Sequence, residues 1–322
     1  ERDYNAFYLA PEFYSQGNAN YRDVAQNRRS NVLLKPAIGD FDVLAFLGLI
    51  QADGYNPLVV NGSRFTVPPD RQDEILKLTR QPADLAALLG RPFTPGGLLQ
   101  AVTDRGIGLT VSPQEFIAAV LTQADASFEA TFGEGYWVDH WFYILDLLDG
   151  YLAVYPDHQD ELLFGKAVTP YFDSPAFVQP RAAKTVLADH GKVRQYGAVI
   201  VDDEKAALIA ARRHTPNLAR IAHGLGEVYR TTVFAKLLGL AVIKFATLDP
   251  LGMGIEMEAG KPGWCDALNG LPGLFGSSLS ETYELGRLLD FLLAALAQKG
   301  IGAVELPVEQ ADLLGDVGAQ LV

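Results

Sequence analysis

Two segments of the chain place carboxylic acids beside large aromatic rings. The segment 260–278 reads GKPGWCDALNGLPGLFGSS and has Trp264 two residues before Asp266, with Glu256 and Glu258 just upstream. Glycines let a backbone approach a ligand closely, and an indole ring offers a stacking surface beside a group that can donate a proton. The alternative interpretation is a turn shaped by Gly and Pro around a buried Trp.

The second segment, 132–157, is denser in such groups. Within eight residues it holds Glu134, Tyr136, Trp137, Asp139, His140 and Trp141. A helix is expected to begin near Val138, which puts Asp139 in its first turn, where an acid also serves as a simple helix cap. The crowding of acids, imidazole and rings favours a binding or catalytic role over the cap.

A third polar segment, 14–31, is rich in amides and includes Tyr21 and Arg22. Amides, carboxylates and guanidinium groups are the donors and acceptors that sugar hydroxyls need, and Tyr adds a flat apolar face. A solvated surface loop is the alternative. If the three segments form one site, Tyr21 or Arg22 should line a cleft together with Asp139 and Asp266.

The elements that must position these segments are mainly helices. Ser112 opens a capping box before a helix predicted over 113–124, and Ser278 opens another before a helix over 281–298. Gly300 follows that second helix, where a left-handed residue is expected.

Other patterns complete this mostly helical picture. The stretch 227–246 is apolar on almost every side and predicts a helix buried in protein, while its charged residues interrupt any membrane span. Asn-Gly within 58–67 predicts one β-hairpin, and 196–203 predicts a short strand. Helices joined by short Gly and Pro segments suggest stacked helical hairpins in a single domain, 1–322.

Composition excludes several classes of partner. The chain has 322 residues, 49% of them apolar, and a net charge of −13 without a Lys or Arg run, so neither a nucleic-acid nor a membrane partner is expected. Its one cysteine, Cys265, favours a reducing compartment and hence a cytoplasmic location. The start lacks Met, and we expect a piece of a longer chain.

Metal and serine chemistry have little support. None of the five histidines has a partner at metal-ligand spacing, so no metal site is predicted. No Gly-x-Ser-x-Gly motif occurs, which disfavours a serine nucleophile of that type.

The spacing of YWVDHWFYILDLL (136–148) and GKPGWCDALNG (260–270) resembles the inverting glycoside phosphorylases of the cellobiose and chitobiose type and their (α/α)6-barrel relatives among the glycoside hydrolases. The resemblance covers roughly residues 130–300. It implies an all-α, (α/α)6-barrel-like toroid of helical hairpins and an oligosaccharide substrate with β-linked glucose.

Matching positions carry over the family's roles. The resemblance implies that Asp139 is a sugar-binding carboxylate, Trp264 its neighbouring Trp and Asp266 the general acid. The chain departs from the family at Gly263 and Cys265, where the family has Asp and Asn. Asp266 therefore lacks two polar neighbours. This difference affects the expected activity more than the expected fold.

The residue types suit glycosidic cleavage, which needs a protonated carboxyl at the leaving oxygen and a nucleophile on the opposite face. Trp264 would desolvate Asp266 and keep it protonated. A hydrolase needs a second carboxylate to activate water, from Glu134, Glu256 or Glu258. A phosphorylase instead uses inorganic phosphate as co-substrate, and no other cofactor is expected.

The sequence thus predicts a glycoside hydrolase or glycoside phosphorylase. The predicted substrate contacts are Tyr21, Arg22, Trp137, Asp139, His140 and Trp264. The rival interpretation, supported by the changes at Gly263 and Cys265, is a non-catalytic carbohydrate-binding or interaction module with a degenerate site.

Overall fold

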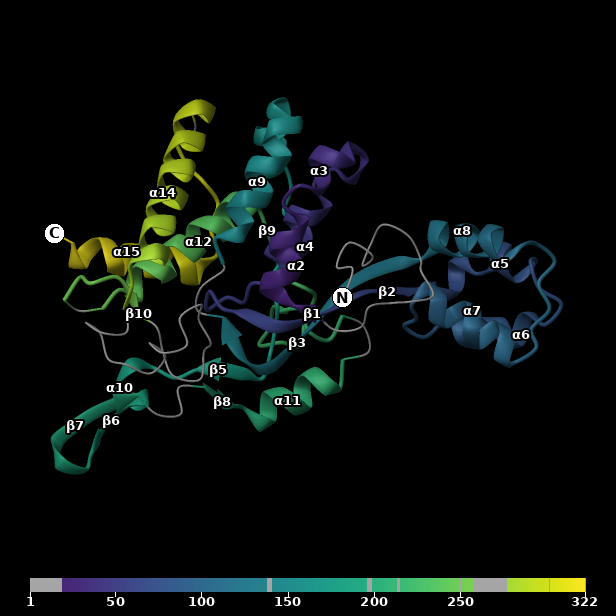
Figure 1. Cartoon of the computed structure of the whole chain (residues 1–322), viewed down its shortest axis with the longest axis horizontal. Helices are drawn as coiled ribbons and strands as arrows, with labels where there is room; N and C mark the ends of the chain where they lie inside the picture. Colours follow the sequence, from purple (N-terminus) through teal and green to yellow (C-terminus); the bar gives the residue numbers. More distant parts are fainter. Residues whose placement is uncertain are drawn as a thin grey trace. The chain divides into compact units, whose positions relative to one another are not determined.

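Helices dominate the structure, a computed structural model of the chain, and its strands form small antiparallel sheets (Figure 1). It describes residues 19–137, 141–195, 199–212, 215–249, 251–256, 277–300 and 302–321. The mostly helical composition predicted from the sequence is confirmed.

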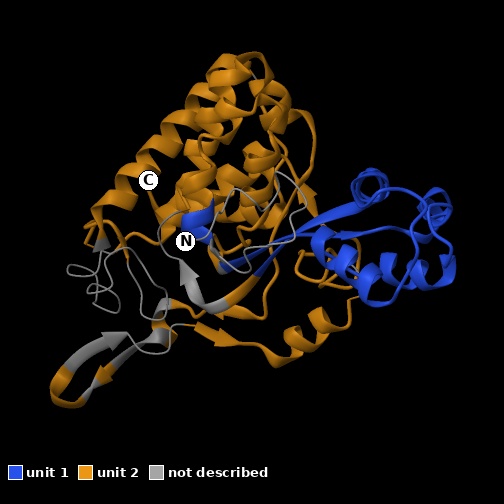
Figure 2. Ribbon diagram, turned by 45° about the vertical axis from the view of Figure 1, so that its right-hand side comes forward, with its two compact units in different colours: residues 1–24, 59–130 blue, residues 25–58, 131–322 orange. Residues whose placement is uncertain are grey.

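Packing divides the chain into two compact units (Figure 2). Unit 1 comprises residues 1–24 and 59–130, and unit 2 comprises residues 25–58 and 131–322. That residues 1–322 form a single domain stays a prediction.

The first sheet has three strands, and three helices lie between its first two strands in the sequence. Its strands are β1 (Ala19–Asn20), β2 (Asn56–Thr66) and β3 (Asp125–Trp137), in the order β1-β2-β3. Between β1 and β2 lie α2 (Tyr21–Arg28), α3 (Asn31–Leu34) and α4 (Phe41–Gly48).

Two predictions fail at this sheet. The hairpin predicted in 58–67 is instead one continuous strand, β2, and Gly62 takes a positive φ of 86° without reversing the chain. The Asn-Gly signal was overruled because β2 is hydrogen-bonded to β1 and β3, which come from distant parts of the sequence. The start of the segment 132–157 also belongs to a strand, because β3 extends to Trp137.

The helices of unit 1 begin as their sequences dictate. They are α5 (Asp73–Leu76), α6 (Pro82–Leu89), α7 (Pro95–Asp104) and α8 (Pro113–Gln123). Proline occupies the first position of α6, α7 and α8, where its missing N–H costs nothing. The predicted capping box is confirmed, since the Glu115 N–H donates to the Ser112 hydroxyl and the Ser112 N–H to the Glu115 carboxylate.

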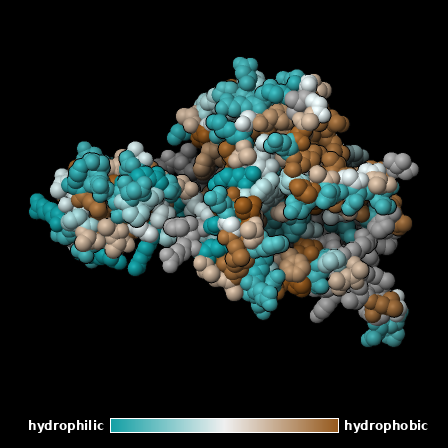
Figure 3. Space-filling view, turned by 180° about the vertical axis from the view of Figure 1, so that it is seen from behind, coloured by the Kyte–Doolittle hydropathy of each residue, from teal (hydrophilic) through white to brown (hydrophobic). Residues whose placement is uncertain are grey.

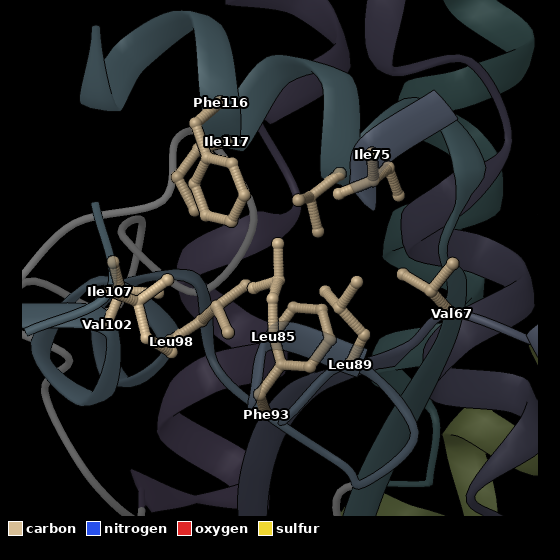
Figure 4. Packing of buried hydrophobic residues seen from close by; sticks show 11 residues of the cluster. Val67, Ile75, Leu85, Leu89, Phe93, Leu98, Val102, Ile107, Phe116 and Ile117 are labelled. Atoms are coloured by element: carbon tan, nitrogen blue, oxygen red, sulfur yellow. The ribbon is translucent and has the colours of Figure 1, made fainter. Parts of the chain in front are cut away.

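Apolar side chains from these helices form the core of unit 1. Leu85 and Leu89 of α6 point toward Leu98 of α7 and Phe116 of α8 (Figure 4). Phe116 is 0% exposed, so its ring contacts only other protein atoms and no solvent.

Phe116→Ala should therefore lower the free energy of unfolding of unit 1 by about 3–5 kcal/mol, the usual cost of an unfilled Phe cavity. Urea unfolding with a probe in this unit measures the effect. Gln114→Ala, on the exposed face of the same helix, is the matched control and should change stability by less than about 0.5 kcal/mol. Equal effects of the two substitutions would refute the assigned core.

The longer helices of unit 2 are α9 (Tyr143–Val154), α12 (Val233–Ala246), α14 (Leu279–Lys299) and α15 (Val308–Gln320). Contacts join α12 to α14 and α15, and α4 to α9. The prediction of a helix over 281–298 is confirmed by α14, which ends at left-handed Gly300 with a φ of 64°.

Small strands and short helices complete unit 2. They are β4 (Thr169–Pro170), β5 (Ala176–Val178), α10 (Arg181–Lys184), β6 (Thr185–Ala188), β7 (Lys192–Gln195), β8 (Val199–Val201), α11 (Asp203–Ala210), β9 (Arg230–Thr231), β10 (Ile255–Glu256) and β11 (Ser277–Ser278). The pairs β4 with β9, β5 with β8, β6 with β7 and β10 with β11 are all antiparallel.

Three predicted boundaries in unit 2 are corrected. The buried helix predicted over 227–246 begins at Val233, because the preceding residues pair with β4 and Thr232 then caps α12. The helix predicted from Val138 begins at Tyr143 as α9, after β3 has kept the chain extended. Within the described residues, the strand predicted over 196–203 is Val199–Val201.

The molecular surface is largely polar on the face drawn in Figure 3, with hydrophobic areas between the hydrophilic ones. Among the described helices, none combines the length and the apolar character that a membrane crossing requires.

Asp42, in the first turn of α4, is a buried acid, 5% exposed. Burial raises the pKa of Asp42 from 3.8 to about 6, while the charge of Arg28 acts in the opposite direction. A carboxyl whose pKa is higher in the folded than in the unfolded state stabilises the fold only while it is protonated.

Asp42→Asn should remove this titration. Between pH 4 and pH 6 the wild type should lose up to about 3 kcal/mol of stability relative to the variant, from about 1.4 kcal/mol per unit of pKa difference. Urea unfolding of both proteins at several pH values measures the gap. Asp290→Asn, on the exposed face of α14, should show no such pH-dependent gap. A gap that stays constant with pH for Asp42→Asn would contradict the assignment.

Candidate functional site

Two lysines are buried on α12, an otherwise apolar helix. Lys236 is 1% exposed and Lys244 is 2% exposed. Lysine is almost never fully buried without partners, because its ammonium group loses its hydration. The surroundings of both lysines therefore show where unit 2 accommodates charge.

Lys236 is held by a carbonyl and an aromatic ring. Its Nζ donates to the Pro170 carbonyl at 2.5 Å and lies 4.3 Å from the centroid of the Tyr171 ring. Burial lowers the pKa of Lys236 well below its usual value. The Tyr171 hydroxyl accepts a hydrogen bond of 2.6 Å from the Gln310 side chain, which connects α15 to the rest of unit 2.

Lys244 lies over two aromatic rings. Its Nζ is 4.8 Å from the centroid of Tyr55 and 6.0 Å from that of Trp141. Both distances allow attraction between the ammonium group and the ring faces. Tyr55 and Trp141 are 7% and 1% exposed, respectively, so the ammonium group lies among side chains shielded from water.

The carboxylate of Asp53 belongs to the same cluster. It accepts hydrogen bonds from the side chain of Gln51 at 3.1 Å and from the backbone N–H of Tyr55 at 3.3 Å. Burial raises the pKa of Asp53, whereas these two bonds and the charges of Lys244 and Lys205 act in the opposite direction. Asp53 thus lies within electrostatic range of two cations that come from different helices.

Glu256 adds a second carboxylate. It is 5% exposed in β10, and its N–H donates to the Thr247 carbonyl at 3.2 Å. Burial, Asp53 and Glu256 together raise the pKa of the Tyr55 hydroxyl, in decreasing order of effect. We call Lys244, Asp53, Tyr55, Trp141 and Glu256 the α12 cluster.

The two strands on either side of the acid-bearing segment 257–276, β10 and β11, pair with one another. Ile255 is opposite Ser278, and Glu256 is opposite Ser277. The Ile255 N–H also donates to the Thr282 hydroxyl of α14 at 3.0 Å. The described residues on either side of this segment are therefore side by side next to the α12 cluster.

Asp173 forms ion pairs with two cations. The Asp173 carboxylate receives Lys205 Nζ at 2.7 Å and Arg212 Nη1 at 2.8 Å. Among the effects on the pKa of Asp53, the charge of Lys205 is the smallest.

The structure describes only part of the predicted site. Asp139, His140, Glu258, Trp264 and Asp266 lie outside the described residues. Glu134 and Trp137 belong to β3, but their side chains also lie outside the described part of the chain.

The two remaining predicted contacts, Tyr21 and Arg22, lie on α2, so the polar loop predicted over 14–31 is helical from Tyr21 to Arg28. Tyr21 is 0% exposed, and burial raises the pKa of its hydroxyl. Its ring has no face open to a ligand in this structure. The Nε–H group of Arg22 donates a hydrogen bond of 3.0 Å to the carboxylate of Asp23.

Sequence reasoning overlooked two patterns that were present. Tyr21, Val24, Ala25 and Arg28 are all 0% exposed and recur at helical spacing. Phe128, Ala130 and Phe132 alternate with polar residues, the period of a strand. Lys244 was noted only as an interruption of a membrane span, although a charge in an apolar helix also signals a buried partner.

No protein-family model matches the chain, and no curated protein was found to match it. Among the described residues, no three His, Cys, Asp or Glu side chains are grouped so that they could hold a metal ion.

A double-mutant cycle tests the α12 cluster. Lys244→Met and Asp53→Asn each remove one charge, and because the two groups attract one another, we expect a favourable coupling of about 0.5–3 kcal/mol in the free energy of unfolding. Urea unfolding of the wild type, both single variants and the double variant provides the four values. Pairing Asp53→Asn with Lys166→Met, at an exposed lysine of unit 2, should give additive effects. Additivity with Lys244→Met would show that the two charges do not interact.

Proposed function

We propose that the chain is a carbohydrate-active enzyme that cleaves a glycosidic bond of an oligosaccharide by an inverting, acid-catalysed mechanism. The supporting observation is that residues flanking both acid-bearing segments belong to the α12 cluster. Trp141 directly follows Asp139 and His140, and Glu256 directly precedes 257–276. Lys244 Nζ lies 6.0 Å from the centroid of the Trp141 ring, and the charge of Glu256 contributes, after burial and Asp53, to the raised pKa of Tyr55.

In this proposal Asp266 is the general acid that protonates the leaving oxygen, and Asp139, His140 and Trp264 bind the sugar. Glu256 is the preferred second carboxylate, because it is buried and adjoins the same segment as Asp266. Inverting cleavage requires the two carboxyl groups to be about 6.5–9.5 Å apart, which leaves room for a nucleophile between them. Glu134 and Glu258 are the other candidates for this role.

The finer architecture and the setting belong to the same proposal. The helices of unit 2 would form part of an (α/α)6-type toroid, supported by the packing of α12 against α14 and α15 and of α4 against α9. The substrate would be an oligomer of β-linked glucose. A cytoplasmic location is proposed from the single cysteine.

A non-catalytic carbohydrate-binding module is the second candidate. Gly263 and Cys265 favour it, because they replace the polar neighbours that the acid has in the family that the chain resembles. Incubation with β-linked glucose oligomers, with and without inorganic phosphate, distinguishes the possibilities. Cleavage without phosphate indicates a hydrolase, cleavage that requires phosphate indicates a phosphorylase, and binding without cleavage indicates the module.

Asp266→Asn should lower the turnover of a natural β-glucoside linkage about 10²–10⁴-fold, because the amide keeps the shape but has no proton to transfer. Substrate binding should change little. A substrate with a good leaving group needs less protonation, so its turnover should be partly spared. Steady-state kinetics on the two substrates measures the difference.

Asp290→Asn is the matched control, since it makes the same change on the exposed face of α14 and should leave both rates unaltered. Full turnover of the natural linkage by a folded Asp266→Asn variant would eliminate Asp266 as the acid. A proportional loss on both substrates would also contradict the role, because it would indicate misplaced substrate rather than a missing proton.

A further inference from the structure

The helix α15 packs against α12 without burying any residue of its own (Figure 1). Its half-buried side chains are Gln310, Leu313 and Val317, and all its other residues are exposed. These three recur at helical spacing, so they form the single face that α15 turns toward unit 2. A helix that buries so little apolar surface opens locally at a low cost in free energy.

Gln310 supplies the polar attachment of α15. Its side-chain amide donates the hydrogen bond of 2.6 Å to the Tyr171 hydroxyl, and it lies so close to Gly239 of α12 that a Cβ there would overlap it. The amide oxygen of Gln310 is buried and has no hydrogen-bond partner in the described part of the chain. A buried acceptor without a partner is unfavourable and offsets part of what the bond contributes. The attachment through Gln310 is therefore weak as well.

Lys236 lies beneath this attachment. Gly239 follows Lys236 by three residues, so both lie on the same face of α12. The Tyr171 ring that Lys236 Nζ faces at 4.3 Å is the ring whose hydroxyl Gln310 binds. The contact between α15 and α12 therefore lies over the amine of Lys236.

The surroundings of this amine suit an uncharged group. Within the described ranges, no acid forms an ion pair with Lys236, whose Nζ donates to the carbonyl of Pro170. A buried ammonium group without a carboxylate is costly. Acylation of a lysine removes its charge, so an acylated Lys236 would need no acid to balance it.

We propose that α15 is a reversible cover and that Lys236 is a modification site, open to small acyl donors only while α15 is released. The amine nitrogen attacks the carbonyl carbon of the donor, the bond from that carbon to its leaving group breaks, and the nitrogen gives a proton to the solvent. The product is an uncharged amide on Lys236. This inference does not depend on glycosidic cleavage.

Timed acetylation of the full chain with acetic anhydride, followed by mass spectrometry of its peptides, compares three lysines. Exposed Lys166 should react fastest. Lys244, which is buried on the same helix as Lys236 but lies over Tyr55 and Trp141, should react slowest. Lys236 should react at a rate between these two, because it needs only the release of α15. Equal rates for Lys236 and Lys244 would overturn the proposal.

Two variants release α15 without a change at Lys236. In Gly239→Ala the new Cβ displaces the Gln310 amide, while alanine favours the helical conformation of α12. Gln310→Ala removes the bond to Tyr171 directly. Each variant should raise the rate of acetylation at Lys236 about 3–10-fold, from the loss of one hydrogen bond and its packing. The rates at Lys166 and Lys244 should stay unchanged.

Gly315→Ala is the matched control, since it makes the same exchange on the exposed face of α15, where a Cβ would have no neighbour within 4 Å. It should leave the rate at Lys236 unchanged. An unchanged rate at Lys236 in folded Gly239→Ala and Gln310→Ala proteins would show that α15 is not the cover, with folding verified by thermal unfolding. Equal acceleration at Lys236 and Lys244 would also refute the proposal, because it would indicate opening of α12 itself.

Discussion

The buried positive charge of Lys244 is the constraint on which much of unit 2 depends. An ammonium group inside an apolar helix is costly unless nearby groups replace its water. Here the faces of Tyr55 and Trp141 and the carboxylate of Asp53 do so. Tyr55 directly precedes β2, and Trp141 lies two residues before α9. The charge therefore brings the starts of these two elements close to α12.

Two very short sheets begin the two main helices of unit 2 in the same way. Thr232 follows β9, and Ser278 is the last residue of β11. An N-cap residue needs an extended backbone, and strand pairing imposes the same conformation. Thr232 then accepts the Ala235 N–H at 3.1 Å, and Ser278 accepts that of Glu281 at 3.5 Å. Strand pairing and helix capping therefore support one another, and the two-residue strands need little stability of their own.

The sequence allowed the capped helices to be predicted, because their signals are local. Ser112 and Ser278 each lie within a turn of the groups that they bond, and Gly300 ends α14 where expected. Strand β2 was misjudged because its partners are far away in the chain, and no local turn signal can reveal them. For the site, only Glu256 was selected as a candidate from the sequence and is also found in the α12 cluster. Asp53 and Lys244 belong to no motif, and only folding brings them together.

Asp53 shows how one acid in unit 2 is stabilised from several sides. The side chain of Gln51 and the backbone N–H of Tyr55 donate hydrogen bonds to its carboxylate. These bonds lower the pKa of Asp53, and the charges of Lys244 and Lys205 act in the same direction. Burial nevertheless outweighs them, so the pKa of Asp53 stays above its usual value. Neighbouring residues alone therefore do not stabilise this charge, and the cation of α12, which is distant in the sequence, has to be brought close by folding.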